Sequence, residues 1–319
     1  MNIQDQSIAV TGGAGFIGCH LVERLLANGA KRVLVIDSLE YGTRGNLGAI
    51  DDRISVFEHR LGAHSRPILT EQLSGYSLLF HLAAEKHNQS IDSPIKVIDA
   101  NIAGTHELLA AAAEVGIRKV VFTSSLYAYG RMKGPPFVET EIPRPRTVYG
   151  TSKLAGEHLC HHIELRANMP CVALRYLFVY GPRQFARQGY KSVIVKNFER
   201  LLEGKAPLVC GDGKQQLDYV YVDDAVEATL RSMESTASDD VFNICTGRGI
   251  SVLELTELMQ QIAGTHHQPV FVPPDATHDS SRVGDPTKCH TKLGFKASVP
   301  LEEGLHRTFE WMKQQHRKV

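Results

Sequence analysis

Short apolar runs rich in β-branched residues alternate with longer segments in which apolar positions recur at helical spacing. Six such runs lie within the first 176 residues, and helical segments separate most of them. A parallel crossover needs roughly a dozen residues, usually including a helix. The alternation therefore predicts a parallel sheet covered by helices on both faces. The predicted strands are Ser7–Val10, Arg32–Ile36, Ile54–Phe57, Ser77–His81, Lys119–Thr123 and Cys171–Tyr176.

The pattern is less regular after Gly181. We expect a doubly wound α/β domain over residues 1–175 and a mainly separate, smaller lobe over residues 176–319. Residues from about 218 to 246 could return to the large sheet as an added helix and strand. The other elements predicted here are helices near 192–203, 252–263 and 301–314 and short strands near 207–209 and 219–222.

Composition and charge exclude several classes of function. Lysine plus arginine and aspartate plus glutamate both total 35, so no overall charge favours nucleic acid or an anionic membrane as a partner. No apolar run approaches the ~18 residues of a membrane span, and no cleavable leader precedes the first strand. The six cysteines are widely separated without metal-ligand spacing, which predicts free thiols, no metal site and a cytoplasmic location.

A glycine-rich turn follows the first predicted strand. Residues 11–18 read TGGAGFIG, and a helix is expected to begin near Phe16. Glycines at this spacing permit a tight turn, let a pyrophosphate approach the backbone, and let the helix pack closely on the strand. The helix N-terminus offers free amides to the anion. The turn therefore predicts a dinucleotide site that includes Gly12, Gly15 and Gly18.

Asp37 indicates which dinucleotide binds. It ends the second predicted strand, 19 residues after Gly18, where a carboxylate accepts hydrogen bonds from the adenosine ribose. Its charge would repel a 2′-phosphate, which favours NAD over NADP. Three basic residues, Lys31, Arg32 and Arg44, lie close to Asp37 in sequence. They leave open the alternative that Asp37 only caps a loop and does not bind the ribose.

Tyr149 and Lys153 form a Tyr-x-x-x-Lys pair, whose i, i+4 spacing places both side chains on one face of a helix. A free tyrosine, with a pKa near about 10, is a poor base, but a nearby ammonium stabilises its phenolate. Such pairs also arise by chance on surface helices. Here Thr123, Ser124 and Ser125 end the fifth predicted strand, at the edge where doubly wound sheets bind ligands.

Taken together, these motifs resemble those of the extended short-chain dehydrogenase/reductases, specifically the nucleotide-sugar epimerases and dehydratases. The resemblance covers nearly the whole chain and implies a Rossmann-like fold. It rests on TGGAGFIG, VIDSLEYGTRGNL (35–47), HLAA (81–84), NIAGT (101–105), TSSLYAYG (123–130), YGTSK (149–153), VYGPRQ (179–184) and DYVYVDDAVEA (218–228).

The resemblance implies NAD as cofactor, a nucleotide sugar as substrate and epimerisation at C4 through a transient 4-keto sugar. The implied catalytic residues are Ser125, Tyr149 and Lys153. The implied cofactor-binding residues are Gly12, Gly15, Phe16, Ile17, Gly18, Asp37, Ser38, Leu82, Ala83, Ala84, Asn101, Thr123, Tyr149 and Lys153. The implied substrate-binding residues are Glu85, Ser124, Ser125, Tyr149, Phe178, Gln216 and Arg282.

Leu126 and Tyr127 separate this sequence from the 4,6-dehydratases and decarboxylases it resembles. Those enzymes carry carboxylates directly after the catalytic hydroxyl, and neither residue can replace a carboxylate as a base at neutral pH. The comparison favours oxidation and reduction at C4 alone. Glu85 is a carboxylate that could do this acid–base work, so a 4,6-dehydratase is kept as an alternative.

Phe178 and Leu217 depart from the pattern of the family. Phe178 stands where an asparagine usually meets the substrate, and Leu217 stands where an arginine usually meets the pyrophosphate. Arg282 matches a second arginine of the family, and Arg183 and Arg187 could supply further charge. Residues 58–62, EHRLG, replace the usual Gly-Asp pair near the adenine. These departures predict an unusual sugar or nucleotide.

Two competing functions follow from the same residues. A one-way 4-ketosugar reductase or dehydrogenase would release its nicotinamide, and a silent NAD-binding regulator would keep the fold without turnover. The resemblance also implies a homodimer formed through helices at 95–115 and 149–167.

Overall fold

The computed structural model describes residues 1–317 apart from residues 49–50, 131–133, 185–190 and 275–280. The larger part of the protein is built around a parallel sheet in the strand order β3-β2-β1-β4-β5-β6-β10. The sequence order reverses between β1 and β4, which is where doubly wound sheets bind ligands. The strands are β1 (Ser7–Thr11), β2 (Arg32–Asp37), β3 (Ile54–Glu58), β4 (Leu78–His81), β5 (Lys119–Ser125), β6 (Cys171–Tyr176) and β10 (Asp240–Ile244). The predicted Rossmann-like fold is confirmed.

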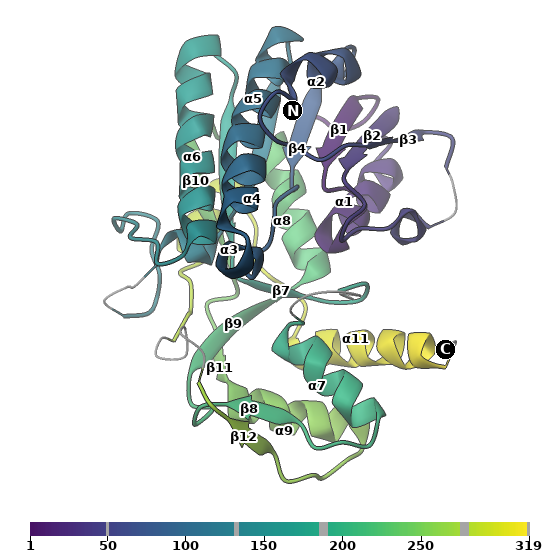
Figure 1. Cartoon of the computed structure of the whole chain (residues 1–319), viewed down its shortest axis with the longest axis vertical. Helices are drawn as coiled ribbons and strands as arrows, with labels where there is room; N and C mark the ends of the chain where they lie inside the picture. The colour runs from purple at the N-terminus through teal and green to yellow at the C-terminus, as the bar shows by residue number, and fades with distance from the viewer. Residues whose placement is uncertain (49–50, 131–133, 185–190, 275–280, 318–319) are drawn as a thin grey trace.

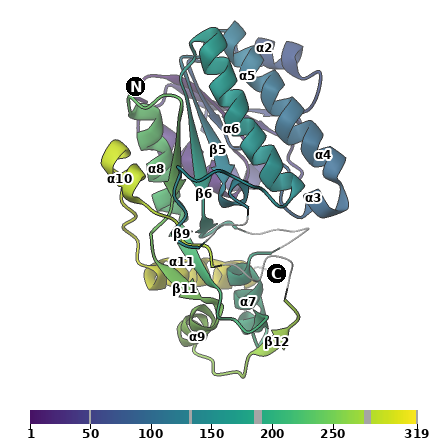
Figure 2. The same ribbon diagram turned by 90° about the vertical axis from the view of Figure 1, so that its left-hand side faces the viewer.

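Helices cover both faces of this sheet (Figure 2). Helices α1 (Phe16–Ala27) and α8 (Val222–Glu234) pack against one face, and α2 (Arg66–Leu73), α5 (Gly104–Glu114) and α6 (Val148–Ala167) pack against the other. Within β1, Ile8 and Val10 face the first layer while Ala9 faces the second. Both faces are buried, so the strands are continuously apolar instead of alternating.

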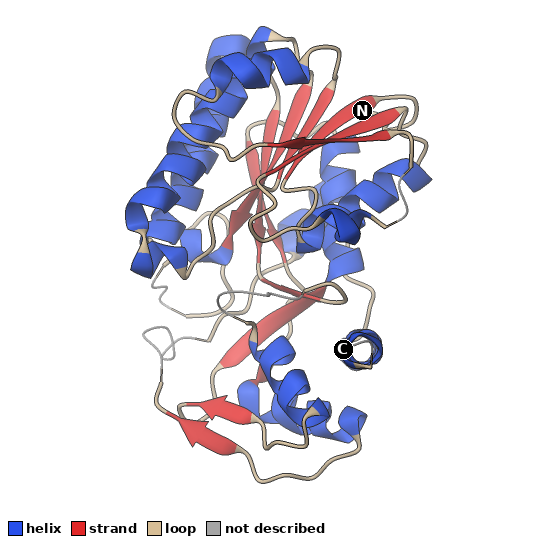
Figure 3. Cartoon of the chain, turned by 45° about the vertical axis from the view of Figure 1, so that its right-hand side comes forward, coloured by secondary structure: helices blue, strands red, loops and turns tan. Residues whose placement is uncertain are grey.

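The smaller lobe lies below the carboxyl ends of the strands (Figures 1 and 3). Its helices are α7 (Val193–Leu202), α9 (Val252–Ala263) and α11 (Leu301–His316). Ser192 caps α7, and Ser251 forms a capping box with Glu254 at the start of α9. These helices begin and end within a few residues of the predicted positions. The lobe's strands are β7 (Phe178–Tyr180), β8 (Leu208–Cys210), β9 (Gln216–Tyr221), β11 (Gly249–Ser251) and β12 (Val270–Val272).

Residues 222–234 and 240–244 return to the large sheet, as α8 and β10. The chain therefore crosses between the two parts several times. Strand β10 pairs in parallel with β6, and the short helix α10 (Thr287–Leu293) packs beside β10. The connections that shape the site are α3 (Gln89–Asp92), α4 (Pro94–Ile98), a π-helical turn η2 (Asp99–Ala103), and the 3₁₀ turns η1 (Arg44–Leu47) and η3 (Leu126–Ala128).

Candidate active site

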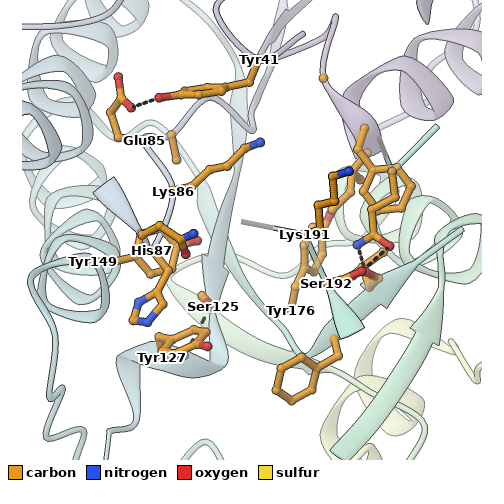
Figure 4. A pocket seen from close by; sticks show the side chains of 18 of the residues that line it. Tyr41, Glu85, Lys86, His87, Ser125, Tyr127, Tyr149, Tyr176, Lys191 and Ser192 are labelled. Atoms are coloured by element: carbon orange, nitrogen blue, oxygen red, sulfur yellow. Dashed lines mark hydrogen bonds between the residues drawn. The ribbon is translucent and has the colours of Figure 1, made fainter. Parts of the chain in front are cut away.

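A cavity of about 980 Å³ lies between the carboxyl edge of the sheet and the smaller lobe. The turn after β1, the end of β5, the start of α6 and the segments after β4 and β6 all contribute to its wall. Every residue expected to bind cofactor or substrate lines this cavity except Asn101 and Gln216. Figure 4 shows its central part, with Tyr149 and Ser125 on one side and Lys191 and Ser192 on the other.

The glycine-rich turn leaves no space for side chains where the backbone folds on itself. Gly12 has a φ of +70°, and a Cβ there would lie 2.7 Å from the backbone nitrogen of Ala83. A Cβ on Gly18 would lie 2.1 Å from the carbonyl oxygen of Gly12. Helix α1 begins just after Gly15 without a side-chain cap. Its first amides therefore remain available to an anion such as a pyrophosphate.

Asp37 is buried at the end of β2, beside this turn. Its Oδ2 accepts a hydrogen bond from the amide of Ala14 over 3.0 Å, and its Oδ1 accepts one from the amide of Leu39 over 2.9 Å. Burial raises the pKa of Asp37, and these two bonds oppose that rise. Each carboxylate oxygen keeps a further lone pair, so a ribose hydroxyl can still be accepted there.

His81 joins the end of β1 to the start of α5. Its Nδ1 lies 2.7 Å from the Thr11 hydroxyl, and its Nε2 lies 2.9 Å from the Thr105 hydroxyl. Because Thr105 donates its proton to the carbonyl of Asn101, its oxygen must accept from Nε2, which assigns the tautomer. Burial lowers the pKa of His81 to about 3, so the imidazole is neutral and structural.

Asn101 lies in the π-helical turn η2 and holds the segment after β4. Its Oδ1 accepts from the amide of Glu85 over 2.7 Å, and its Nδ2 donates to the Glu85 carbonyl and to Ser152 over 3.1 Å each. π-Helical turns occur often at functional sites. Asn101 is not among the residues that line the cavity, so its expected cofactor contact stays a prediction.

Tyr149, Lys153 and Ser125 are brought together as the sequence predicts. The Thr147 hydroxyl accepts from the amide of Gly150 and caps α6, so the helix begins where the Tyr-x-x-x-Lys spacing requires. Burial raises the pKa of Tyr149 to about 12, and a hydrogen bond from the Ser125 hydroxyl opposes that rise. Lys153 Nζ lies 5.8 Å from the centre of the Tyr149 ring. Burial lowers the pKa of Lys153 to about 8.

Ser124 and Ser125 point in different directions, because successive side chains of a strand face opposite sides. Ser125 Oγ accepts from the amide of Tyr127 over 3.3 Å and caps η3. The hydroxyl of Ser124 donates to the carboxylate of Glu157, which is buried behind the strand. Ser125 is thus the hydroxyl that hydrogen-bonds Tyr149, whereas Ser124 is engaged within the protein.

Two further aromatic rings surround Tyr149 and were not predicted. His87 stacks on Tyr127, with ring centres 4.4 Å apart and planes inclined by 23°. Both rings meet Tyr149 edge-on, at 6.0 Å from His87 and 5.8 Å from Tyr127. Figure 4 shows the three rings along one wall of the cavity. His87 follows β4 and Tyr127 follows β5, so their contact depends on the pairing of these strands.

Arg282 lies beside the two positions that depart from the pattern of the family. It is paired with Leu217 in a parallel bridge, and its guanidinium lies 5.6 Å from the Phe178 ring and 5.7 Å from the Tyr127 ring. All four residues line the cavity, whereas Gln216 is exposed outside its wall. The alternation of side chains along β9 explains this, because Gln215 and Leu217 occupy the cavity face.

Glu85 lines the cavity, but its carboxylate is already engaged by three donors. The Tyr41 hydroxyl donates to it over 3.3 Å, Arg60 Nε donates over 3.2 Å, and Lys96 Nζ lies 3.5 Å away. Lys86 lies with its Nζ 4.5 Å from the centre of the Tyr41 ring. Figure 4 places the Tyr41–Glu85 bond at the end of the cavity away from Ser125.

Arg183 does not supply charge to the cavity. Its guanidinium donates to both carboxylate oxygens of Glu23, over 2.7 and 2.6 Å, and to the carbonyl of Asn46. It fastens the smaller lobe to α1 and η1 instead. Arg187 lies outside the described residues.

A family model described as "NAD dependent epimerase/dehydratase family" matches residues 8–245, about three quarters of the chain. The protein belongs to the NAD-dependent epimerase/dehydratase family. The match includes the glycine-rich turn, Ser125, Tyr149 and Lys153. Arg282 and helices α10 and α11 lie beyond it.

Individual epimerases of this family align with almost the whole chain. A UDP-glucose 4-epimerase of Mycolicibacterium smegmatis is 34% identical over 95% of this chain and 97% of its own. The structure of UDP-glucose 4-epimerase with UDP-glucose from Thermotoga maritima is 36% identical, with a TM-score of 0.91 over 97% of this chain and 99% of the other. A UDP-glucuronic acid 4-epimerase from Bacillus cereus, bound to UDP-glucuronic acid and NAD, is 30% identical, with a TM-score of 0.87 over 97% and 99%.

NAD is the cofactor of this epimerase/dehydratase family, and the cavity has the features that NAD requires. The glycine-rich turn would receive the pyrophosphate, and Asp37 would receive the adenosine ribose. Tyr149 and Lys153 stand at the other end, where the nicotinamide would lie. Among the described residues, no group of three or more metal-ligating side chains is gathered, and no helix is long and apolar enough to cross a membrane.

Proposed function

We propose that this protein interconverts nucleotide sugars that differ in configuration at C4. The observation that carries the proposal is the grouping of Ser125, Tyr149 and Lys153 at one wall of a large cavity, with Leu126 and Tyr127 after the serine instead of carboxylates. These three side chains can move a proton on and off a hydroxyl. Neither Leu126 nor Tyr127 can supply the carboxylate that elimination of water requires.

In the proposed reaction, the phenolate of Tyr149 accepts the proton of the sugar 4-hydroxyl. The Ser125 hydroxyl hydrogen-bonds both this oxygen and Tyr149, and Lys153 supplies the positive charge that stabilises the phenolate. NAD held by the glycine-rich turn and Asp37 would supply the acceptor for the C4 hydride and the donor for its return to the other face of the sugar. Tyr149 then gives its proton back, so no net oxidation occurs.

The proposed substrate is a nucleotide sugar whose diphosphate is held by Arg282. Arg282 lies in register with Leu217, so it projects from the same face of the sheet as the arginine that Leu217 replaces. Phe178 and Tyr127 flank the guanidinium at the cavity wall, which supports its assignment to the diphosphate. With one arginine instead of two, and with Phe178 in place of an amide, we expect the protein to prefer an unusual sugar or nucleotide.

Glu85 does not favour the dehydratase alternative. Elimination of water needs a carboxyl group that is free to take up or give a proton near C5 or C6 of the sugar. The carboxylate of Glu85 is instead held by Tyr41, Arg60 and Lys96 at the far end of the cavity. We therefore assign Glu85 to the wall of the cofactor region, and its contact with the substrate stays a prediction.

We further propose a homodimer in a reducing, cytoplasmic setting. Helices α4 and α6 carry the exposed apolar side chains Ile95 (74% exposed) and Leu165 (71% exposed). A groove of about 410 Å³ between α5 and α6 is lined partly by Leu109, Leu159 and Ile163. All six cysteines are free thiols, five of them buried. Light scattering would measure the mass of the particle, and a monomer would contradict the dimer.

The function is tested by incubating the purified protein, with its own nicotinamide, with UDP-, dTDP- and GDP-linked hexoses and hexuronates. Interconversion of C4 epimers without added cofactor supports the proposal. Stoichiometric consumption of added NADH or NADPH would identify a one-way reductase. Bound NAD with no turnover of any sugar would identify a silent NAD-binding protein.

A further inference from the structure

A buried ion pair lies directly behind the wall that carries Ser125. Glu157 follows Lys153 by one turn of α6, and Arg175 lies in β6. Arg175 Nε donates to Oε1 of Glu157 over 2.9 Å, and Nη2 donates to Oε2 over 2.7 Å. The side chains of Arg175 and Glu157 are only 4% and 6% exposed. Burying two charges has a large desolvation cost, so such a pair is poor evidence of stabilisation by itself.

The ion pair holds both ends of residues 124–129, the segment that carries Ser125. At the first end, the Ser124 hydroxyl donates to Glu157. At the second end, the Arg175 guanidinium lies 4.3 Å from the centre of the Tyr129 ring. The Tyr129 hydroxyl donates onward to Asn243 over 2.7 Å. The Ser125 hydroxyl is therefore fixed by groups that it does not itself contact.

Strand register explains why this arrangement forms. Ser124 and Arg175 are direct partners in the parallel pairing of β5 with β6. Their side chains consequently project to the same face of the sheet, where α6 presents Glu157. Ser125, one residue further, does not reach Glu157 and instead hydrogen-bonds Tyr149 at the start of α6.

Glu157 also faces the Lys153 ammonium along the same helix. The charged and titratable groups around Lys153 are Tyr149, Glu157 and Cys160 on α6 and the neutral His81 on β4. Burial lowers the pKa of Lys153, and the carboxylate of Glu157 is the strongest influence that opposes this. A neutral residue at position 157 would make the protonated form of Lys153 less stable.

We infer that Glu157 is a positioning residue of this site: with Arg175 it fixes the segment that carries Ser125, and its carboxylate maintains the charge of Lys153. This role rests on the proposed epimerase function, because that reaction requires Ser125 and a protonated Lys153 at the same time. Glu157 acts only through these two groups and does not touch the substrate.

The test compares Glu157→Gln with Glu164→Gln in the NAD-loaded protein. Glu164 lies two turns further along α6 and also joins it to β6, by accepting from the amide of Cys171 over 2.9 Å. We expect Glu157→Gln to lower kcat about tenfold or more with little change in KM, and to lower the pKa of Lys153. NMR of lysine labelled with ¹³C at Cε gives that pKa, with Lys153→Arg assigning the signal. Glu164→Gln should leave kcat and the titration unchanged.

An unchanged kcat and an unchanged Lys153 titration in Glu157→Gln would overturn the inference. Should that variant fail to fold, Ser124→Ala decides, because it keeps the ion pair and removes only the bond at one end. A lower kcat at constant KM supports positioning, whereas a higher KM at constant kcat, or no effect, refutes it. If the wild-type protein turned over no nucleotide sugar, the proposed function would fail, and the Lys153 titration would still test the role of Glu157.

Discussion

The side-chain amino group of Lys153 donates a 2.8 Å hydrogen bond to the backbone carbonyl of Thr123. This bond joins α6, which carries Tyr149, to the end of β5, which carries Ser125. It directs the ammonium away from solvent and holds it 5.8 Å from the centre of the Tyr149 ring. The catalytic helix and the catalytic strand are thus fixed to each other by the residue whose charge the reaction needs.

Replacing Tyr149 by phenylalanine should remove turnover without unfolding the protein. The ring would still meet Tyr127 and His87 edge-on, but the hydroxyl that takes the 4-hydroxyl proton would be gone. Loss of a general base typically lowers kcat by about 10²–10⁴-fold. Steady-state kinetics and the bound NAD content would measure the effect, with Tyr76→Phe as a control far from the cavity. A variant that kept most of its kcat would exclude Tyr149 as the base.

Activity should fall at alkaline pH as Lys153 loses its charge. Burial lowers the pKa of Lys153 to about 8, so the ammonium is present below that pH and is lost above it. Loss of the ammonium disfavours the Tyr149 phenolate, and we expect kcat to decline above about pH 8. In Lys153→Arg the side chain stays charged, so the variant should be slower at its optimum but should lack this alkaline decline. The same decline in both proteins would assign it to another group.

Arg282 should account for most of the affinity for the diphosphate. A hydrogen bond to a charged group contributes about 1.5–3 kcal/mol, so Arg282→Met should weaken UDP binding by roughly 10- to 150-fold and raise KM more than it lowers kcat. Leu217→Arg should tighten binding, because it restores a second cation on the same face of the sheet. Calorimetry with UDP, dTDP and GDP would measure both changes. Equal affinities in the wild-type protein and Leu217→Arg would contradict the predicted consequence of Leu217.

Gly18 should be required for the stability of the fold, and Gly15 for the binding of NAD. A Cβ on Gly18 would lie 2.1 Å from the carbonyl oxygen of Gly12, whereas one on Gly15 would meet that oxygen at 3.2 Å and nothing else closely. Gly18→Ala should therefore lower the thermal unfolding temperature markedly. Gly15→Ala should leave it within a few degrees while reducing NAD content, because its methyl group would intrude on the pyrophosphate. Equal destabilisation by both changes would argue against this division.

The sequence predicted those parts of the fold in which local pattern and chemistry agree. The six strands within residues 1–176 are read from apolar runs. The start of α6 near Tyr149 is read from the Tyr-x-x-x-Lys spacing, which brings both side chains to one face only in a helix. Strands β7, β11 and β12 were missed, because three residues are too few to show a period. Strand β8 is equally short but was predicted one residue from its position. The sequence does not decide whether residues 222–234 return to the large sheet, because an amphipathic helix does not indicate which sheet it will cover.

The sequence predicted those site residues that belong to a single motif. It did not predict the side-chain contacts between residues on different strands. His87 and Tyr127 are 40 residues apart, and only the pairing of β4 with β5 brings their rings together. The residues EHRLG were noted as unusual, but the ion pair of Arg60 with Glu85 depends on two loops that the sequence cannot place. The same holds for Ser124, whose hydroxyl is directed to Glu157 by the register of β5 and β6.

The central claim is that hydride leaves C4 of the sugar and returns to C4. The most direct measurement uses a nucleotide hexose that the protein converts, labelled with deuterium at C4, and locates the label in the product by NMR. The account predicts a C4 epimer that retains deuterium at C4, with no label in solvent and no net formation of NADH. Deuterium at C6 of a 4-keto-6-deoxy sugar, or in released nicotinamide, would contradict it and identify a dehydratase or a one-way dehydrogenase.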